Sequence, residues 1–171
     1  MSEATRILGI DPGSRITGYG LIDARRRGND TKLIHFGTIQ TNGEHSARLR
    51  QIFEQVGSLV REFRPHEVAI ERVFVHRNPD SALKLGQARA AALCATFEAD
   101  LPVFEYAARY IKKAVVGRGG ADKIQVQLMV KLLLGMQAEP QADAADALAA
   151  ALCHSLARGT RSLLEEVAVN S

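Results

Sequence analysis

Ile7-Leu8-Gly9-Ile10-Asp11-Pro12-Gly13-Ser14 is the stretch that indicates how the rest of the chain is arranged. Its apolar first half is typical of a buried central strand, and the Pro-Gly pair ends such a strand abruptly. Asp11 is then the last residue of the strand, at the edge where open α/β sheets place their ligand sites. A carboxylate there suits a metal ion. An Asp also opens an Asx turn before Pro-Gly, and this stretch alone favours neither interpretation.

The composition indicates one domain of ordinary size. With 171 residues the chain can bury a core of its own. Hydrophobic residues make up 46% and aromatic residues only 5%, which suggests an α/β domain rich in small aliphatic side chains. The formal net charge of +3, with Arg as the main basic residue, permits a nucleic-acid partner but does not establish one.

No signal peptide is expected at the start of the chain. No membrane helix is expected either, because no apolar run approaches the roughly 20 residues that span a bilayer. We therefore expect a soluble, cytoplasmic protein. Cys94 and Cys153 have no close spacing or partner motif, and we expect both to be reduced thiols in the core.

Apolar periodicity outlines the remaining elements. Strands over Ile16–Ile22 and Lys32–Thr41 are expected to complete an antiparallel meander with the first strand. The elements expected after the meander are a helix over Glu44–Phe63, a buried strand over Glu67–Val75, a helix from Pro79 to about Asp100, a strand over Leu101–Tyr106, and helices over Ala107–Val116, over Asp122–Leu134 and from about Gln141.

Three further acids lie at informative positions. Glu71 is in the middle of the Glu67–Val75 strand, where a charge is costly unless it is paired with an arginine or a metal. If this strand runs parallel to the first, Glu71 lies beside Asp11. Asp143 and Asp146 are three residues apart on a predicted helix and share a face, although such pairs are often only solvated.

The four acids together predict a metal site, provided that the last helix packs across the two strands. A set of carboxylates suits Mg²⁺ or Mn²⁺ rather than Zn²⁺, which prefers Cys and His. Two such ions about 3.5–4 Å apart can activate water and stabilise a leaving oxygen in phosphodiester hydrolysis. The five histidines show no ligand spacing and are expected to be structural or exposed.

Two other features bear on binding. Four basic residues fall within twelve positions, either as DNA contacts or as solvated charges: Lys112, Lys113, Arg118 and Lys123. The loop Gly117–Gly120 lacks the Lys-Ser/Thr ending of a P-loop. The predicted helix from Pro79 carries small residues along one flank, which allows another helix to approach, either within the chain or across a dimer.

Six blocks of the sequence resemble the RuvC family of bacterial Holliday-junction resolvases. They are Gly9–Arg15 with Thr17–Gly20, Ala69–Glu71, Asp80–Arg89, Pro102–Ala107, Gly117–Lys123 and Gln141–Ala147. The blocks span nearly the whole chain in the family's order. The resemblance implies the ribonuclease-H-like fold, an α/β fold with a five-stranded mixed sheet flanked by helices. We expect this domain over residues 1–158 and a partly ordered tail over 159–171.

The same resemblance implies a homodimeric crossover junction endodeoxyribonuclease, which nicks four-way DNA junctions symmetrically in recombination and repair. It implies a metal site with two Mg²⁺ or Mn²⁺ ions held by Asp11, Glu71, Asp143 and Asp146. It also implies DNA contacts by Lys112 and Lys123 and base stacking by Phe74, which is otherwise a core residue. The RuvA and RuvB branch-migration proteins are the partners that it implies.

Three alternatives remain open at this point. An ATP-binding domain of the actin and sugar-kinase type opens with a similar strand and turn, but it needs two lobes and 171 residues supply one. A related nuclease acting on RNA would be built on the same fold. A non-catalytic module that binds junctions would not need four converging acids.

Overall fold

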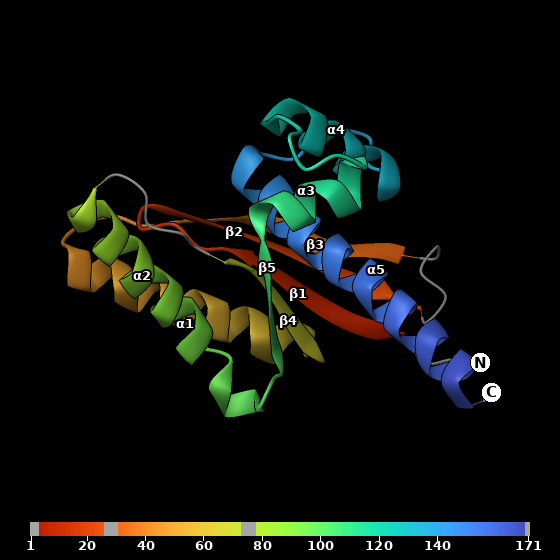
Figure 1. The fold of residues 1–171 in the computed structure, drawn as a ribbon. Coiled ribbons are helices and arrows are strands. Elements are labelled where there is room, and N and C mark those ends of the chain that lie inside the picture. Colours follow the sequence, from red (N-terminus) through yellow and green to blue (C-terminus); the bar gives the residue numbers. More distant parts are fainter. Residues whose placement is uncertain (1–3, 26–30, 73–77, 170–171) are drawn as a thin grey trace.

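A five-stranded mixed sheet forms the centre of the structure (Figure 1). The computed structural model describes residues 4–25, 31–72 and 78–169, with side chains described as far as residue 160. The strand order is β3-β2-β1-β4-β5. The strands are β1 (Thr5–Asp11), β2 (Ile16–Ala24), β3 (Thr31–Gln40), β4 (Glu67–Arg72) and β5 (Val103–Ala107).

The pairing of the strands confirms the predicted topology. β2 is antiparallel to both β1 and β3, so the first three strands form a meander. β4 is parallel to both β1 and β5. The first and fourth strands are therefore parallel neighbours, as the argument from Asp11 and Glu71 required.

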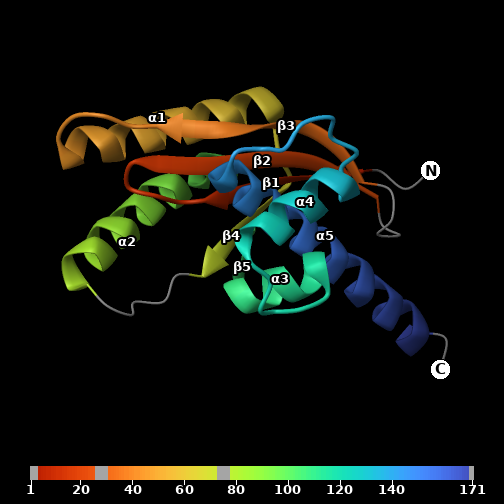
Figure 2. The ribbon, with the colours of Figure 1, turned by 90° about the horizontal axis from the view of Figure 1, so that it is seen from above.

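Helices cover both faces of the sheet (Figure 2). One face is covered by α1 (His45–Phe63) and α2 (Pro79–Cys94). The other face carries α3 (Ala108–Val116), α4 (Lys123–Leu133) and α5 (Ala142–Val169). Helix α5 packs across β1, β2 and β4 and continues beyond the sheet (Figure 1). The predicted α/β fold with a five-stranded mixed sheet is confirmed.

The two faces have separate cores, and β1 contributes to both. Leu8 and Ile10 pack in the core beneath α1 and α2. Ile7 packs in the core beneath α5. Because successive side chains of a strand point to opposite faces, Gly9 and Asp11 face α5.

Side-chain caps begin two of the helices. The Asn78 side chain accepts hydrogen bonds from the N–H groups of Asp80 and Ser81 at the start of α2. Asp122 and Gln125 form a reciprocal capping box at the start of α4, which makes Lys123 the first residue of that helix.

Two expectations about α2 were wrong. The helix ends at Cys94 rather than near Asp100, because the chain passes into a short 3₁₀ turn at Phe97–Ala99, and Asp100 adopts a left-handed φ of 49°. Cys94 is exposed, since the buried face of the helix passes through Ala88, Ala92 and Ala95 instead. Cys153 is buried, and both thiols are free.

Two predicted boundaries are not tested by the described residues. Residues 73–75 of the predicted strand lie outside the described residues. Helix α5 continues through the predicted domain boundary at residue 158, and the division into a domain over 1–158 and a tail over 159–171 stays a prediction. Within the described part of the chain, no helix is long and apolar enough to cross a membrane.

Candidate active site

Asp11 is the last residue of β1, and Glu71 is the last but one of β4, the neighbouring parallel strand. Ile10 of β1 lies opposite Ile70 of β4, so the residues that follow each of them are side by side. Ile10 and Ile70 pack in the core beneath α1 and α2. By alternation along the strands, Asp11 and Glu71 therefore face α5.

A buried hydroxyl holds the turn that follows Asp11. The Thr17 hydroxyl donates to the Gly13 carbonyl at 3.0 Å and accepts from the Gly13 N–H at 3.3 Å. Thr17 is fully buried. The carboxyl end of β1 is thus fixed by contacts within its own hairpin.

Glycines on β1 and β2 let α5 lie directly against the sheet. Gly18 is the register partner of Asp11, and a Cβ on Gly18 would overlap the main-chain carbonyl oxygen of Asp143. A Cβ on Gly9 would overlap the carbonyl oxygen of Ala147. This close approach places the first turns of α5, with their two acids, beside the end of β1.

Two side-chain hydrogen bonds hold the segment that leads into α5. The Thr38 hydroxyl of β3 donates to Gln141 Oε1 at 3.1 Å. Gln127 Nε2 of α4 donates to the Pro140 carbonyl oxygen at 3.1 Å. The start of the helix is therefore tied to the sheet and to a neighbouring helix.

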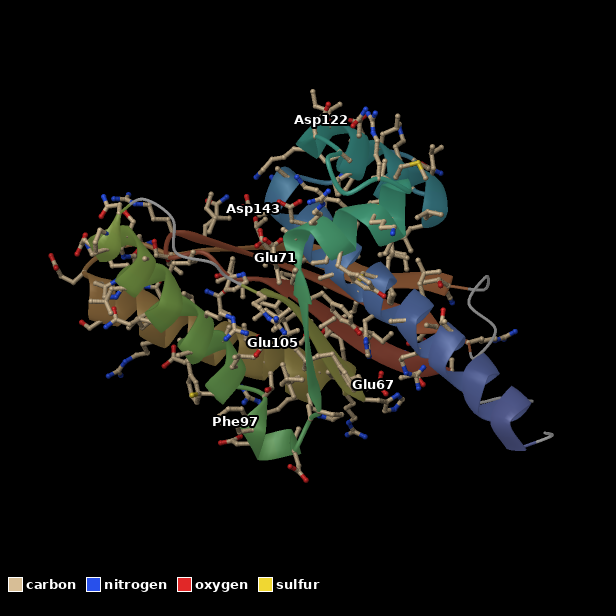
Figure 3. All side chains as sticks on the ribbon, viewed as in Figure 1. Glu67, Glu71, Phe97, Glu105, Asp122 and Asp143 are labelled. Carbon is tan, nitrogen blue, oxygen red and sulfur yellow. The ribbon has the colours of Figure 1, made fainter. Side chains whose placement is uncertain are left out.

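Burial and repulsion from neighbouring acids raise the pKa values of Asp11, Glu71 and Asp146. Burial raises the pKa of Asp11 from an ordinary 3.8 to about 7, with added repulsion from Asp146, Glu71 and Asp143. Burial, and then the charge of Asp146, raises the pKa of Glu71. Burial also raises the pKa of Asp146, which Lys123 opposes. The structure therefore brings the four predicted acids within electrostatic reach of one another, and Figure 3 shows Glu71 and Asp143 at the same end of the sheet.

The four carboxylates do not form a preassembled set of metal ligands among the described residues. In the described part of the chain, no three His, Cys, Asp or Glu side chains are placed to hold one ion. Lys123 Nζ instead lies 3.5 Å from Asp146 Oδ2, and the Lys123 side chain is 72% exposed. Partly desolvated carboxylates that repel one another fit a hard divalent cation, which takes oxygen ligands.

The predicted basic contacts lie on α3, on the loop that follows it and at the start of α4: Lys112, Lys113, Arg118 and Lys123. Lys112 and Lys123 are close enough to the acids to oppose the rise in the pKa values of Glu71 and Asp146. Lys113 and Arg118 are exposed. Phe74 lies outside the described residues.

A polar cluster at the opposite end of β4 was missed in the sequence. His154 of α5 lies between Glu67 and Tyr106, and all three side chains are joined by short polar contacts. The sequence offered no signal for it, because the partners of His154 are 48 and 87 residues away in the chain.

Comparison with known families gives a match over most of the chain. The model of the family "Crossover junction endodeoxyribonuclease RuvC" matches residues 7–154. RuvC of Tolumonas auensis is 58% identical over 152 residues, which cover 88% of this chain and 87% of that protein. RuvC of Methylococcus capsulatus is 52% identical over 164 residues, which cover 95% of this chain and 98% of that protein.

Solved structures agree with the sequence relatives. RuvC of Thermus thermophilus has a TM-score of 0.81 at 36% identity, covering 92% of this chain and 96% of its own. The RuvC of that organism in complex with a Holliday junction substrate has a TM-score of 0.86 at 35% identity, covering 92% and 97%. The fold is therefore the ribonuclease-H-like fold, and the chain belongs to the RuvC family of crossover junction endodeoxyribonucleases.

Proposed function

We propose that this protein is an endonuclease that resolves four-way DNA junctions by metal-dependent hydrolysis of phosphodiester bonds. The supporting observation is the group of four acids at the carboxyl ends of β1 and β4, where burial and mutual repulsion raise the pKa of Asp11 to about 7. The Thermus thermophilus RuvC in complex with a Holliday junction substrate is 35% identical to this chain, and we assign the same class of substrate here.

The four acids are the proposed metal ligands: Asp11, Glu71, Asp143 and Asp146. Two Mg²⁺ or Mn²⁺ ions would supply an activated water and stabilise the leaving oxygen. The protein contributes the frame, since two strand ends and one helix face hold the carboxylates on fixed backbone. Because burial raises the pKa of Asp11, proton loss at this residue should favour metal binding as the pH rises through about 7.

The basic residues are the proposed phosphate contacts. Lys112 and Lys123 flank the acids, so they would offset the repulsion between the carboxylates and the DNA backbone. Lys113 and Arg118 would extend this basic surface from α3 into the next loop. Phosphate contacts position a protein on DNA without reading its sequence. Base stacking is assigned to Phe74.

The proposed assembly is a homodimer, because paired nicks in a near-two-fold junction require two related active sites. Helix α2 supplies a candidate surface, a shallow apolar groove of about 490 Å³. It is lined by Pro79, Ala82, Leu83, Gly86, Gln87 and Ala90. Leu83 is 63% exposed in the single chain, and burying it across a dimer would be favourable.

Two further parts of the proposal follow from the family. The RuvA and RuvB branch-migration proteins are the expected partners, since a resolvase acts on the junctions that branch migration moves. The cytoplasm is the expected location, where bacterial chromosomal DNA lies.

The direct test uses a labelled four-way junction and a duplex of matched sequence, each with and without Mg²⁺. We expect paired nicks in opposing strands of the junction only, and only with the metal. Equal cutting of junction and duplex, or cutting that is unaffected by a chelator, would contradict the proposal. Structured RNA as a third substrate separates this activity from that of a related RNA nuclease.

A further inference from the structure

A hydrogen-bonded cluster joins α5 to β4 and β5 on the face that carries the acids. His154 Nε2 lies 2.7 Å from Glu67 Oε2, and His154 Nδ1 lies 2.6 Å from the Tyr106 hydroxyl oxygen. Arg158 Nε donates to the same Glu67 oxygen at 2.8 Å. We call Glu67, Tyr106, His154 and Arg158 the β4–α5 clamp.

The clamp is fixed to the same elements as the proposed metal ligands. Glu67 and Glu71 are four residues apart on β4, so their side chains leave the same face of the strand. Figure 3 shows them at opposite ends of that strand. His154 follows Asp146 by eight residues on α5, which is slightly more than two turns and keeps both on a similar side of the helix.

Tyr106 connects the clamp to the acid site directly. It lies opposite Glu71 in the parallel pairing of β4 with β5. Register partners in a sheet point to the same face, so the Tyr106 and Glu71 side chains share a face, and the Tyr106 ring packs against the core beneath α5. Loss of the Tyr106 hydroxyl therefore affects a residue that is paired directly with the proposed ligand Glu71.

His154 is closely packed within the cluster. The residue is only 1% exposed, and the Phe104 ring is stacked on its imidazole with the ring centroids 4.2 Å apart. An ionised Glu67 only accepts hydrogen bonds, so His154 Nε2 carries the proton in that contact. If the imidazole is neutral, Nδ1 then accepts from Tyr106, and one orientation of the ring satisfies both partners.

We propose that the β4–α5 clamp is a positioning device that sets the spacing between Glu71 on β4 and the two acids on α5. This inference rests on the proposed metal-dependent nuclease. It assigns Tyr106, Glu67 and His154 a role in metal affinity, although none of them would touch the metal or the DNA. The acids repel one another, and the clamp would oppose that repulsion by fixing β4 and β5 to α5.

The test is Tyr106→Phe in the full chain, because it removes one hydroxyl and keeps the ring. Binding of Mn²⁺ without DNA is measured by electron paramagnetic resonance, and junction binding is measured in Ca²⁺. We expect half-saturation by Mn²⁺ to need at least about a threefold higher concentration, with junction affinity within about twofold of the wild type. The matched control is Tyr110→Phe, on a half-exposed tyrosine stacked on the outer side of Tyr106.

A second variant keeps the proposal testable if Tyr106→Phe does not fold. Glu67→Gln retains an oxygen acceptor for His154 but removes the charge that pairs with Arg158, and the same weakening of Mn²⁺ binding is expected. Unchanged Mn²⁺ binding in the folded variants would overturn the proposal, as would equal losses of metal and junction binding. Failure of the wild type itself to bind Mn²⁺ would instead contradict the proposed nuclease.

Discussion

At the scale of single residues, the central feature is the cost of holding Asp11 ionised. Burial and three neighbouring acids raise its pKa to about 7, and burial also raises the pKa values of Glu71 and Asp146. The folded, metal-free protein therefore binds a proton at Asp11 more tightly than the unfolded chain does. The raised pKa of Asp11 makes its ionised form costly in the folded protein, and a bound cation would offset that cost.

A pH dependence of stability follows from the raised pKa of Asp11. Between about pH 4 and pH 7 the folded state binds more protons than the unfolded state, so stability falls as the pH rises through this window. Asp11→Asn removes this contribution. In a chelator, the variant should lose less stability than the wild type between pH 5 and pH 8, measured by thermal denaturation. Identical pH profiles of stability for the variant and the wild type would show that the pKa of Asp11 is not raised in the folded protein.

Lys123 provides a second prediction at this scale. Each lost phosphate contact should reduce the slope of log affinity against log salt by about 0.9. Lys123→Ala should therefore flatten this slope for junction binding by about one, without changing which sequence is cut. The control is Lys32→Ala, an exposed lysine at the end of the sheet away from the acids. A slope equal to that of the wild type would show that Lys123 makes no contact with a DNA phosphate.

At the scale of elements, the decisive contact is between α5 and the glycines of the meander. Gly18 and Gly9 leave room for the main chain of the helix, and buried alanines of α5 complete the fit. The position of Asp143 and Asp146 thus depends on the absence of side chains on two strands. The glycines on the sheet surface therefore determine where the two acids of α5 lie relative to Asp11.

Substitution of Gly18 by Ala tests this dependence. The added Cβ would overlap the Asp143 carbonyl oxygen, so α5 must shift, at a cost of about 1–3 kcal/mol for overpacking. Cleavage should fall more than junction binding does, since the acids move away from Asp11. Gly57→Ala on α1 is the control, because its Cβ would meet only the end of the flexible Arg61 side chain. If the two variants cleave equally well, the glycine contact does not position the acids.

Local patterns predicted most of these elements. Asp11-Pro12-Gly13 marked the end of β1, and the three-residue spacing of Asp143 and Asp146 placed both on one helix face. The end of α2 at Cys94 was not predictable in this way, since apolar and small residues continue past it into a 3₁₀ turn. The contacts of His154 depend on tertiary packing between distant segments, which no local pattern reports.

At the scale of the whole molecule, the sheet separates two surfaces. The face with α3, α4 and α5 carries the acids and the basic residues, whereas the face with α1 and α2 carries the apolar groove. A dimer formed through α2 would leave both acid sites accessible to DNA. This arrangement suits one protein acting on two opposing strands of a junction.

The proposed dimer can be tested at the groove. Ala90 is exposed and lines it, whereas Ala91 packs partly against the core and is a poorer choice for substitution. Ala90→Glu should produce monomers in light scattering and should lose paired incision while single nicks continue. Ala47→Glu, at an exposed position of α1, should remain dimeric. A wild type that is monomeric at assay concentrations would contradict both the groove and the symmetry argument.

We expect the four acids to serve metal-dependent cleavage and not DNA binding. Single-turnover cleavage of a labelled four-way junction by Asp143→Asn, over a range of Mg²⁺ concentrations and with junction affinity measured in parallel, tests it most directly. We predict that cleavage collapses at every Mg²⁺ concentration while junction affinity stays within about twofold of the wild type. Cleavage at the wild-type rate would show that the four-acid site is wrong.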